Sequence, residues 1–200
     1  MNILAVDATG EMVSVALDAG GKIFAASKSG KRPHDETLLP VVEGVLKRGK
    51  LSWNDLDAVA AAAGPGRFTG IRIGLSFASI LGMKLKVPAL ALSRLEAAAE
   101  KSPADDVLAA LPGWKNEVYS QRFRRGKSGL AADGDAVWTA PEEWPRVRAE
   151  AEARGLAVAY GETDAADLLP VARRRLKAKK LPPFAPFYLK PAGYEKKPAR

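Results

Sequence analysis

The segment from residue 56 to residue 85 constrains the fold of this chain more than any other. It reads LDAVAAAAGPGRFTGIRIGLSFASILGMKL, an apolar run, a glycine-proline loop and a helix with no charged residue between Ile73 and Met83. A surface helix normally keeps a polar stripe toward water, and these residues wind about three turns without one. We therefore expect this helix to be covered on more than one side. One cover is its own sheet, and the other is a second helix or another protein.

Length and composition place the chain among globular proteins. Its 200 residues allow one domain or two small ones, and 47% of them are hydrophobic against 27% charged. The longest uncharged apolar stretch falls short of the roughly 20 residues of a membrane helix, so we expect no membrane span and no membrane partner. The amino terminus, MNILAVDATG, lacks the basic start and cleavage site of a secretory signal. A cytoplasmic location is the expectation.

The residue inventory excludes several enzyme classes. The chain has no cysteine and one histidine, His34. Disulfides, thiolate metal sites and cysteine nucleophiles are therefore excluded, and little is left for metal ligation or a serine-histidine relay. We expect no metal site, and a protease is a poor interpretation for the same reason.

Positive charge gathers late in the chain. Six of the eight net positive charges fall in the second hundred residues, above all in Arg173, Arg174, Arg175 and the lysines that follow them. Such a run can bind RNA phosphates, since clustered Lys and Arg release condensed counterions. It is also typical of a solvated helix end with a frayed tail. The prolines between residues 182 and 191 predict an extended strip packed along a surface.

Strand and helix signals follow a definite order in the first half. We expect strands over 3–8, 13–18, 22–27, 57–63 and 87–92, and helices over 34–48, 69–86 and from 93 onward. The first three strands form an antiparallel meander. Ser93 and Glu96 predict a capping box for the third helix. This β-β-β-α-β-α-β-α order is that of a ribonuclease-H-like unit.

The second half repeats this order faintly. Strands are expected over 107–111, 117–123, 129–132 and 156–160, with one helix capped near Thr139 and a basic helix over 163–177. We therefore predict an α/β protein with two ribonuclease-H-like lobes in tandem, the actin-like ATPase and sugar-kinase architecture. The predicted domains are an amino-terminal lobe, 1–102, and a reduced carboxy-terminal lobe, 103–200.

A turn after the first strand resembles a phosphate-binding turn. There Asp7 would hold a metal or water, and Thr9 and Gly10 would offer a hydroxyl and backbone N–H groups to phosphate. An Asx turn at the end of a strand explains the same residues. The equivalent place in the second half, residues 111–116, has no Asp or Thr. At most half a nucleotide site is expected, and no cofactor.

The loop at residues 64–70 opens a row of small residues at four-residue intervals. The row comprises Gly70, Gly74, Ala78 and Gly82. Small side chains at this spacing let another backbone come close, either the protein's own sheet or a partner's helix. Thr69 is placed to cap the helix. The loop lacks the Lys-Ser/Thr ending of a Walker loop.

Several stretches together resemble the TsaB family, the non-catalytic partner subunits of the bacterial tRNA threonylcarbamoyladenosine machinery, grouped as glycoprotease-like. The matching stretches are 3–7, Arg32-Pro33-His34, 38–40, 64–74, Val87-Pro88, 93–95, 116–119 and 187–190. The string GPG-x-FTG-x-RIG is the specific part, and the resemblance is densest over residues 1–100. It implies an actin-like fold and a heterodimer with the paralogous catalytic subunit TsaD. Helped by the ATPase TsaE, that complex modifies the adenosine beside the anticodon.

The resemblance also implies where the partner binds. In the family the TsaD contact is made by the two helices that correspond here to 34–48 and 69–86. The candidate interface residues are His34, Leu38, Leu39, Val42, Gly70, Ile73, Gly74, Phe77, Ala78, Leu81 and Gly82. The metal-binding histidines of the catalytic paralog correspond to Arg94 and Ala98, so no metal is expected here. Apart from the resemblance, a lone histidine near a helix start, such as His34, is more often a cap or packing residue than a functional one.

Three departures from the family pattern affect the nucleotide prediction. Ala8 stands where the family usually has threonine or serine, Arg67 where it has serine, and 112–115 replace Asp-Ala-Arg. The prediction is therefore a non-enzymatic scaffold subunit that forms a homodimer when its partner is absent. The alternatives are a stand-alone ATP-dependent phosphotransferase of the sugar-kinase class and direct tRNA binding by the basic carboxy-terminal region.

Overall fold

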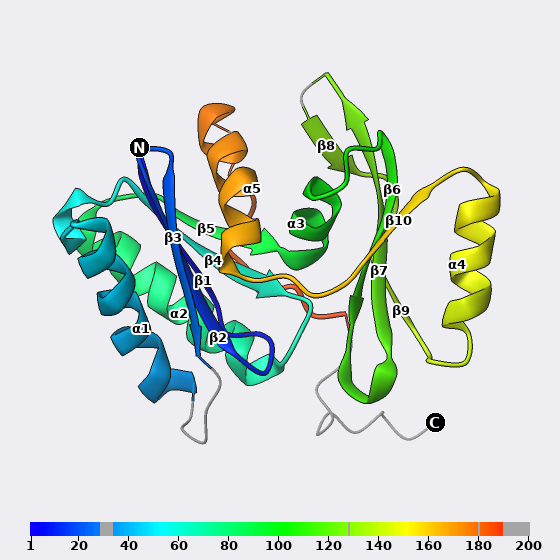
Figure 1. Ribbon diagram of the computed structural model, residues 1–200, viewed down its shortest axis with the longest axis horizontal. Coiled ribbons are helices and arrows are strands. Elements are labelled where there is room, and N and C mark those ends of the chain that lie inside the picture. The colour runs from blue at the N-terminus through cyan, green and yellow to red at the C-terminus, as the bar shows by residue number, and fades with distance from the viewer. Residues whose placement is uncertain (29–33, 128, 180, 190–200) are drawn as a thin grey trace.

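The computed structural model describes residues 1–28, 34–127, 129–179 and 181–189, in which two β-sheets stand side by side (Figure 1). Helices cover the outer side of each sheet and fill a central layer between them. The predicted mixed α/β architecture with two lobes is thus present. The last part of the basic tail, from Lys190 onward, lies outside the described residues, as does Arg32-Pro33.

The first sheet has the strand order β3-β2-β1-β4-β5. Its strands are β1 (Asn2–Asp7), β2 (Val13–Ala19), β3 (Lys22–Lys28), β4 (Ala58–Gly64) and β5 (Ala89–Ser93). The first three form the predicted antiparallel meander, and β4 pairs in parallel with both β1 and β5. Strand β4 reads AVAAAAG with every residue buried, because both faces of the sheet are covered.

Helices α1 (His34–Gly49) and α2 (Phe68–Leu85) cover one face of this sheet, and α5 (Ala165–Lys177) covers the other (Figure 1). Alternate residues of β1 show the division, since Leu4 packs in the cluster under α1 and α2 while Ile3 packs with Leu168 of α5. By length and composition, α2 is the one described helix that could cross a membrane. Its small-residue side, however, lies on the sheet.

The second sheet has the order β10-β6-β7-β8, with β9 paired to β7. Its strands are β6 (Asp106–Pro112), β7 (Val118–Gly126), β8 (Gly129–Ala132), β9 (Val137–Thr139) and β10 (Ala157–Tyr160). Strand β9 was not predicted from the sequence. Helix α4 (Trp144–Ala153) packs outside this sheet through Ala151, whereas α3 (Arg94–Glu100) packs inside it through Leu95 and Ala98.

Each of the two central helices packs mainly on the sheet of the other half of the chain, taking residue 102 as the boundary between the halves. Helix α3 follows the first sheet in the chain, yet most of its apolar residues pack on the second. Helix α5 follows the second sheet, yet Leu168, Leu169 and Val171 complete the core of the first. The ranges 1–102 and 103–200 therefore separate the sheets but not the helices that cover them.

Residues 181–189, here called the C-terminal segment, run back along the junction of the lobes as the predicted extended strip. The Phe187 N–H donates to the Ala63 carbonyl at 2.7 Å, at the end of β4. The Phe187 side chain contacts the core clusters of both sheets, and Leu189 packs against the second. The segment therefore joins the two lobes behind the central helices.

Two helix starts and one capping box differ from the sequence predictions. Helix α2 begins at Phe68 after Arg67, and no side chain caps it, so Thr69 is not its cap. Helix α4 begins at Trp144 rather than near Thr139, which belongs to β9. Ser93 does cap α3, accepting from the N–H groups of residues 95 and 96, while the Glu96 carboxylate pairs with arginines of α5 instead of closing a capping box. Ion pairs with α5 therefore replace the Glu96 half of the predicted capping box, while the Ser93 half is present.

Candidate functional site

Helix α2 uses its small residues against its own sheet. A Cβ added to Gly70 would lie 1.8 Å from the Ala8 carbonyl oxygen, and one added to Gly82 would lie 3.0 Å from the Ala89 Cβ. Gly74 sits over Ala61, and Ala78 is fully buried. The row therefore allows close approach of helix to strand, one of the two roles that the sequence left open.

The side of α2 that faces away from the sheet carries exposed apolar side chains among polar ones such as Ser76. Ile80 is 64% exposed and Met83 71% exposed, while Ile73 and Phe77 are half-buried beside them. On the neighbouring helix α1, Leu39 is 48% exposed. These five apolar residues are called the outer face below. Large apolar side chains gathered on one side of a helix pair are typical of a surface that binds another protein.

A groove of about 500 Å³ runs along α2 beside this outer face. Its far wall is the C-terminal segment, through Phe184, Pro186 and Tyr188. The Tyr188 ring stacks on Phe68 with centroids 4.9 Å apart, and the Arg72 guanidinium lies 3.7 Å from the centre of the Phe68 ring. The C-terminal segment thus borders the surface on the side away from α1.

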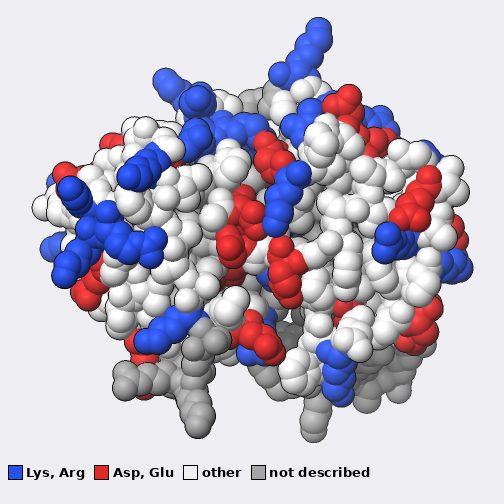
Figure 2. Space-filling model, in the orientation of Figure 1, with Lys and Arg blue, Asp and Glu red and all other residues white. Residues whose placement is uncertain are grey.

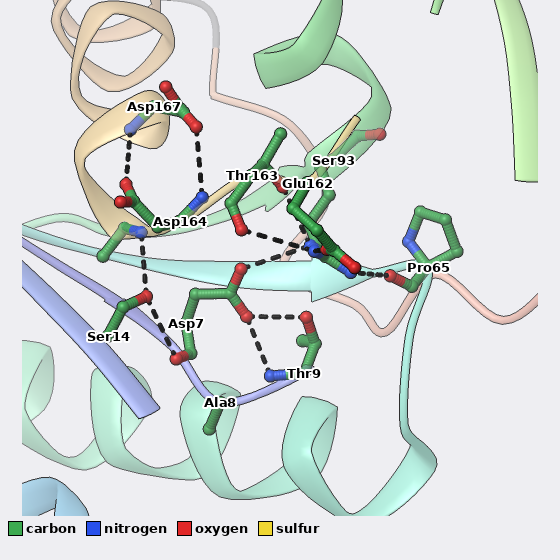
Figure 3. Close-up of polar contacts among 12 residues, drawn as sticks. Asp7, Ala8, Thr9, Ser14, Pro65, Ser93, Glu162, Thr163, Asp164 and Asp167 are labelled. Atoms are coloured by element: carbon green, nitrogen blue, oxygen red, sulfur yellow. Dashed lines mark hydrogen bonds and ion pairs between the residues drawn. The ribbon is translucent and has the colours of Figure 1, made fainter. Parts of the chain in front are cut away.

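The predicted nucleotide residues lie in one turn, residues 7–11, here called the β1 turn. Asp7 and Thr9 are buried, 3% and 1% exposed. One Asp7 carboxylate oxygen accepts from the Thr9 N–H at 2.8 Å and from the Thr9 hydroxyl at 2.6 Å (Figure 3). This is the Asx turn that the sequence offered as the alternative, and it turns the Thr9 hydroxyl toward Asp7 rather than toward a ligand.

The other Asp7 oxygen pairs with a buried arginine. The Arg94 Nε lies 3.2 Å from it, and both side chains are 4% exposed. Arg94 also donates to the Pro65 carbonyl at 3.0 Å, the Thr163 hydroxyl at 3.0 Å and the Glu162 carboxylate at 3.0 Å (Figure 3). A guanidinium offers five N–H donors in a fixed fork, which suits several acceptors arranged around one plane. Each of the three guanidinium nitrogens of Arg94 is therefore in contact with at least one acceptor of the protein.

This arrangement does not fit a magnesium nucleotide. Magnesium in nucleotide sites is held by carboxylate oxygens that remain free to coordinate it, and both oxygens of Asp7 are committed to Thr9 and Arg94. The cavity between the lobes is small, about 220 Å³, and its opposite wall is formed by residues 112–114, where an exposed Trp114 stands in place of a phosphate-binding side chain. Gly10 lies at the edge of this cavity. Within the described residues, no group of three or more Asp, Glu or His side chains could hold a metal.

His34 joins the start of α1 to the β1 turn. Its Nδ1 lies 3.1 Å from the Ala8 carbonyl oxygen and its Nε2 lies 3.2 Å from the Glu11 carbonyl oxygen. The imidazole therefore packs between a helix and a turn, as the structural interpretation of this residue predicted. It contacts the β1 turn and is partly exposed.

The sequence of this chain is similar to proteins of one known family. The family model for TsaD, tRNA N6-adenosine threonylcarbamoyltransferase, matches residues 26–167. The Escherichia coli (strain K12) tRNA threonylcarbamoyladenosine biosynthesis protein TsaB is 31% identical over 201 residues, which is 86% of this chain and 86% of that protein. The chain belongs to the TsaB family. The TsaB protein of Haemophilus influenzae is 34% identical over 131 residues, covering 64% of this chain and 56% of its own length.

Solved structures agree with this assignment. A structure described as YeaZ from Pseudomonas aeruginosa superposes with a TM-score of 0.73 and 25% identity, covering 94% of this chain and 99% of that one. A second, described as an uncharacterized protein with similarity to peptidase YEAZ from Pseudomonas aeruginosa, gives a TM-score of 0.74 at 26% identity. The two-lobed, actin-like fold, which the order of strands and helices predicted and the TsaB resemblance implied, is confirmed.

For this TsaB-family chain, the predicted interface must be corrected residue by residue. Six of the candidate residues are buried in the protein's own core and cannot be presented to a partner: Leu38, Val42, Gly70, Gly74, Ala78 and Gly82. Leu81 is half-buried and, like Phe77, packs against the core under α1 and α2. The candidate surface therefore moves from the small-residue row to the outer face. The exposed residues Ile80 and Met83 were missed as candidates, although the absence of charge across 73–83 had indicated them.

In this TsaB-family chain the arginines of the basic run form ion pairs with acidic residues of the protein itself. Arg173 pairs with Asp18, which is 1% exposed, and Arg174 and Arg175 both donate to the Glu96 carboxylate, at 2.6 and 2.8 Å. Figure 2 shows acidic side chains along the junction of the lobes and basic ones gathered above it. Three arginines of the predicted RNA-binding run are thus committed to the protein's own carboxylates.

Proposed function

We propose that this chain is a non-catalytic scaffold subunit of a tRNA threonylcarbamoyladenosine-forming complex. In this proposal the outer face of α1 and α2 pairs with a TsaD-like catalytic subunit, which modifies the adenosine beside the anticodon with the help of a TsaE-like ATPase. The work would take place in the cytoplasm. The family assignment supports the pathway, and the exposed apolar side chains of α2 support a pairing role.

The single observation that carries the proposal is the exposure of Ile80 and Met83 on a helix that has no charged residue between Ile73 and Met83. Burying such side chains against a partner removes apolar surface from water at about 25 cal/mol per Å². A second copy of the chain satisfies the same surface when the partner is absent, which gives the proposed homodimer. The committed Asp7 carboxylate supports a non-catalytic role, because the alternative, an ATP-dependent phosphotransferase, needs that group for its metal.

In this proposal the tRNA is bound by the assembled complex and not by α5 of this subunit. The arginines of α5 pair with Asp18 and Glu96, so among the described residues of this helix Lys177 is the basic side chain left for RNA. The proposed role of this subunit is therefore to present and stabilise the catalytic partner.

A charge substitution on the outer face tests the proposal. Ile80→Asp should weaken binding to the purified TsaD-like subunit of the same organism at least about 30-fold, the loss of a typical interface anchor. The matched control is Ile23→Asp, because Ile23 is 51% exposed on β3, where alternation places it on the other face of the sheet from Phe24 and α1. Isothermal titration calorimetry gives both affinities. Unchanged binding by Ile80→Asp, with a folded circular dichroism spectrum, would show that the outer face is not the interface.

A further inference from the structure

The β1 turn holds the starts of both outer helices. The Arg67 N–H, one residue before α2, donates to the Thr9 carbonyl at 2.8 Å. One turn later Gly70 rests directly on the Ala8 carbonyl, where no side chain would fit. The first residue of α1, His34, contacts the carbonyl oxygens of Ala8 and Glu11. The positions at which α1 and α2 leave the sheet are therefore set by one short turn.

The β1 turn in turn depends on Asp7. This carboxylate fixes the turn by accepting from the Thr9 N–H and hydroxyl, and it does so almost out of contact with water. A buried carboxylate of this kind is stable only when a positive charge and further hydrogen bonds compensate its lost hydration. Arg94 is that charge, at 3.2 Å.

Arg94 is itself fixed by two other parts of the chain. The Pro65 carbonyl belongs to the loop that leads from β4 into α2, and it accepts from Arg94 Nη1. Glu162 and Thr163 belong to the residues that lead from β10 into α5, and they accept from Nη2 and Nε. One guanidinium thus connects the turn after β1, the entry to α2 and the entry to the central helix α5.

We propose that Arg94 is a positioning residue that acts as the resident cation of the β1 turn. It holds the starts of α1 and α2 in one arrangement, so the outer face is already formed in the isolated chain and needs no nucleotide or metal to form. The effect on partner binding rests on the proposed function, whereas the effect on the turn does not. The β1 turn and Arg94 thus hold the two helices of the outer face in place whether or not a ligand is bound.

Hydrogen exchange of the isolated, full-length chain tests the proposal. Arg94→Met leaves Asp7 buried without its cation. This loss should raise the equilibrium constant for local opening of the β1 turn by a factor of at least about ten. We expect faster exchange of that size in residues 7–11, 34–38 and 67–71, with unchanged exchange in the β6–β7 hairpin. Arg94→Lys, which restores the charge without the fork, should recover part of the protection. Unchanged exchange near the turn, or an equal increase throughout the chain, would overturn the proposal.

A milder variant covers the case in which Arg94→Met does not fold. Glu162→Ala combined with Thr163→Val removes two side-chain acceptors of Arg94 outside the sheet, where the Glu162 side chain is 69% exposed. Exchange in the same three stretches should rise about threefold or more, as expected for the loss of one or two hydrogen bonds. No change there would also overturn the proposal, as would calorimetric binding of Mg-ATP to the wild-type chain accompanied by slower exchange in residues 7–11.

Affinity for the TsaD-like subunit separates this proposal from the proposed function. If both hold, Arg94→Met weakens binding about tenfold, because part of the binding energy is spent on ordering the helix starts. If Ile80→Asp does not weaken binding, the proposed function fails, while the exchange result still decides the role of Arg94. If Ile80→Asp abolishes binding and Arg94→Met loosens the turn without weakening binding, the link between the turn and the outer face is wrong.

Discussion

Gly70 shows at the scale of one residue how little space separates α2 from the β1 turn. It lies in an ordinary helical conformation, so its missing side chain serves close approach rather than backbone freedom. We expect Gly70→Ala to destabilise the protein by at least about 1–3 kcal/mol, because a methyl group 1.8 Å from the Ala8 carbonyl oxygen forces the helix away from the strand.

Gly44 provides the matched control for that prediction. It lies within α1, exposed, and a Cβ there meets nothing within 4 Å. Gly44→Ala should therefore be neutral or stabilise the protein by up to about 1 kcal/mol, since alanine is the better helix former. Urea unfolding of the two variants measures both effects. Equal stability changes would contradict the close packing of Gly70.

The Asp106 and Arg122 pair gives a prediction for acid stability. Two hydrogen bonds from the Arg122 guanidinium, at 2.8 and 2.5 Å, hold the pKa of Asp106 below its ordinary value of 3.8. Because the folded pKa is lowered, the charged carboxylate stabilises the fold above the ordinary value, and this contribution disappears as the pH falls through the folded pKa. The stability difference between wild type and Asp106→Asn should be constant from pH 7 to about 5 and shrink below about 4. Urea unfolding across this pH range would contradict the pairing if the difference did not change.

At the scale of an element, α5 is a basic helix whose charges serve its own packing. Its apolar stripe completes the first sheet, and its arginines face Asp18 and Glu96 on the elements around it. The Asp164 side chain caps its first turn and accepts from the N–H groups of residues 166 and 167. Cap, stripe and ion pairs together fix the helix in the central layer.

Arg173 provides the test at this scale. Arg173→Met should destabilise the protein by about 1–3 kcal/mol, because among the described residues only the Gly21 N–H would then donate to the buried Asp18 carboxylate. Lys177→Met, at an exposed position of the same helix, should change stability by less than about 0.5 kcal/mol. Thermal unfolding compares the two. A similar effect of both variants would mean that the basic run is a solvated surface after all.

At the scale of the whole molecule, the two lobes are joined by the central helices and by the C-terminal segment. Phe187 is the side chain of that segment that contacts the cores of both lobes. We expect Phe187→Ala to lower the free energy of unfolding by about 1–3 kcal/mol, in proportion to its partial burial.

Phe184 is the control in the same segment. It is 40% exposed at the edge of the groove beside α2, so Phe184→Ala should cost less than about 1 kcal/mol. Chemical denaturation followed by tryptophan fluorescence measures both. If Phe184→Ala cost as much as Phe187→Ala, the segment would stabilise the molecule through the groove rather than through the junction of the lobes.

Much of the fold could be predicted because the spacing of apolar residues within each segment indicates whether it forms a helix or a strand. The predicted helices at 34–48 and 69–86 correspond to α1 and α2 within one residue at each end, since each has a long apolar stripe. The crossing of α3 and α5 could not be predicted, because the stripe of Leu168, Leu169 and Val171 requires an apolar surface but does not say which sheet supplies it. Strand β9 is short and pairs only through long-range contacts, so it gave no local signal.

The candidate site could be predicted only in part, for a similar reason. The absence of charge between Ile73 and Met83 predicted a helix that is covered on more than one side. The structure shows the cover by its own sheet and leaves Ile80 and Met83 exposed, so a second cover by another protein stays a prediction. The sequence did not say which side was which, because glycine rows suit a neighbouring strand as well as a partner helix. The role of Arg94 was missed, since its five contacts come from three segments that lie far apart in the chain.

The placement of α5 has a consequence for how the chain is made. The inner face of the first sheet, with Ile3 and Leu90, is synthesised long before the helix that covers it. At about 5–20 residues per second, the stretch from 94 to 165 takes on the order of ten seconds to emerge from the ribosome. During that interval the nascent chain carries an open hydrophobic sheet, a natural substrate for a chaperone. A premature stop anywhere before α5 would leave that surface bare for good, and the fragment would aggregate rather than survive as a separate lobe.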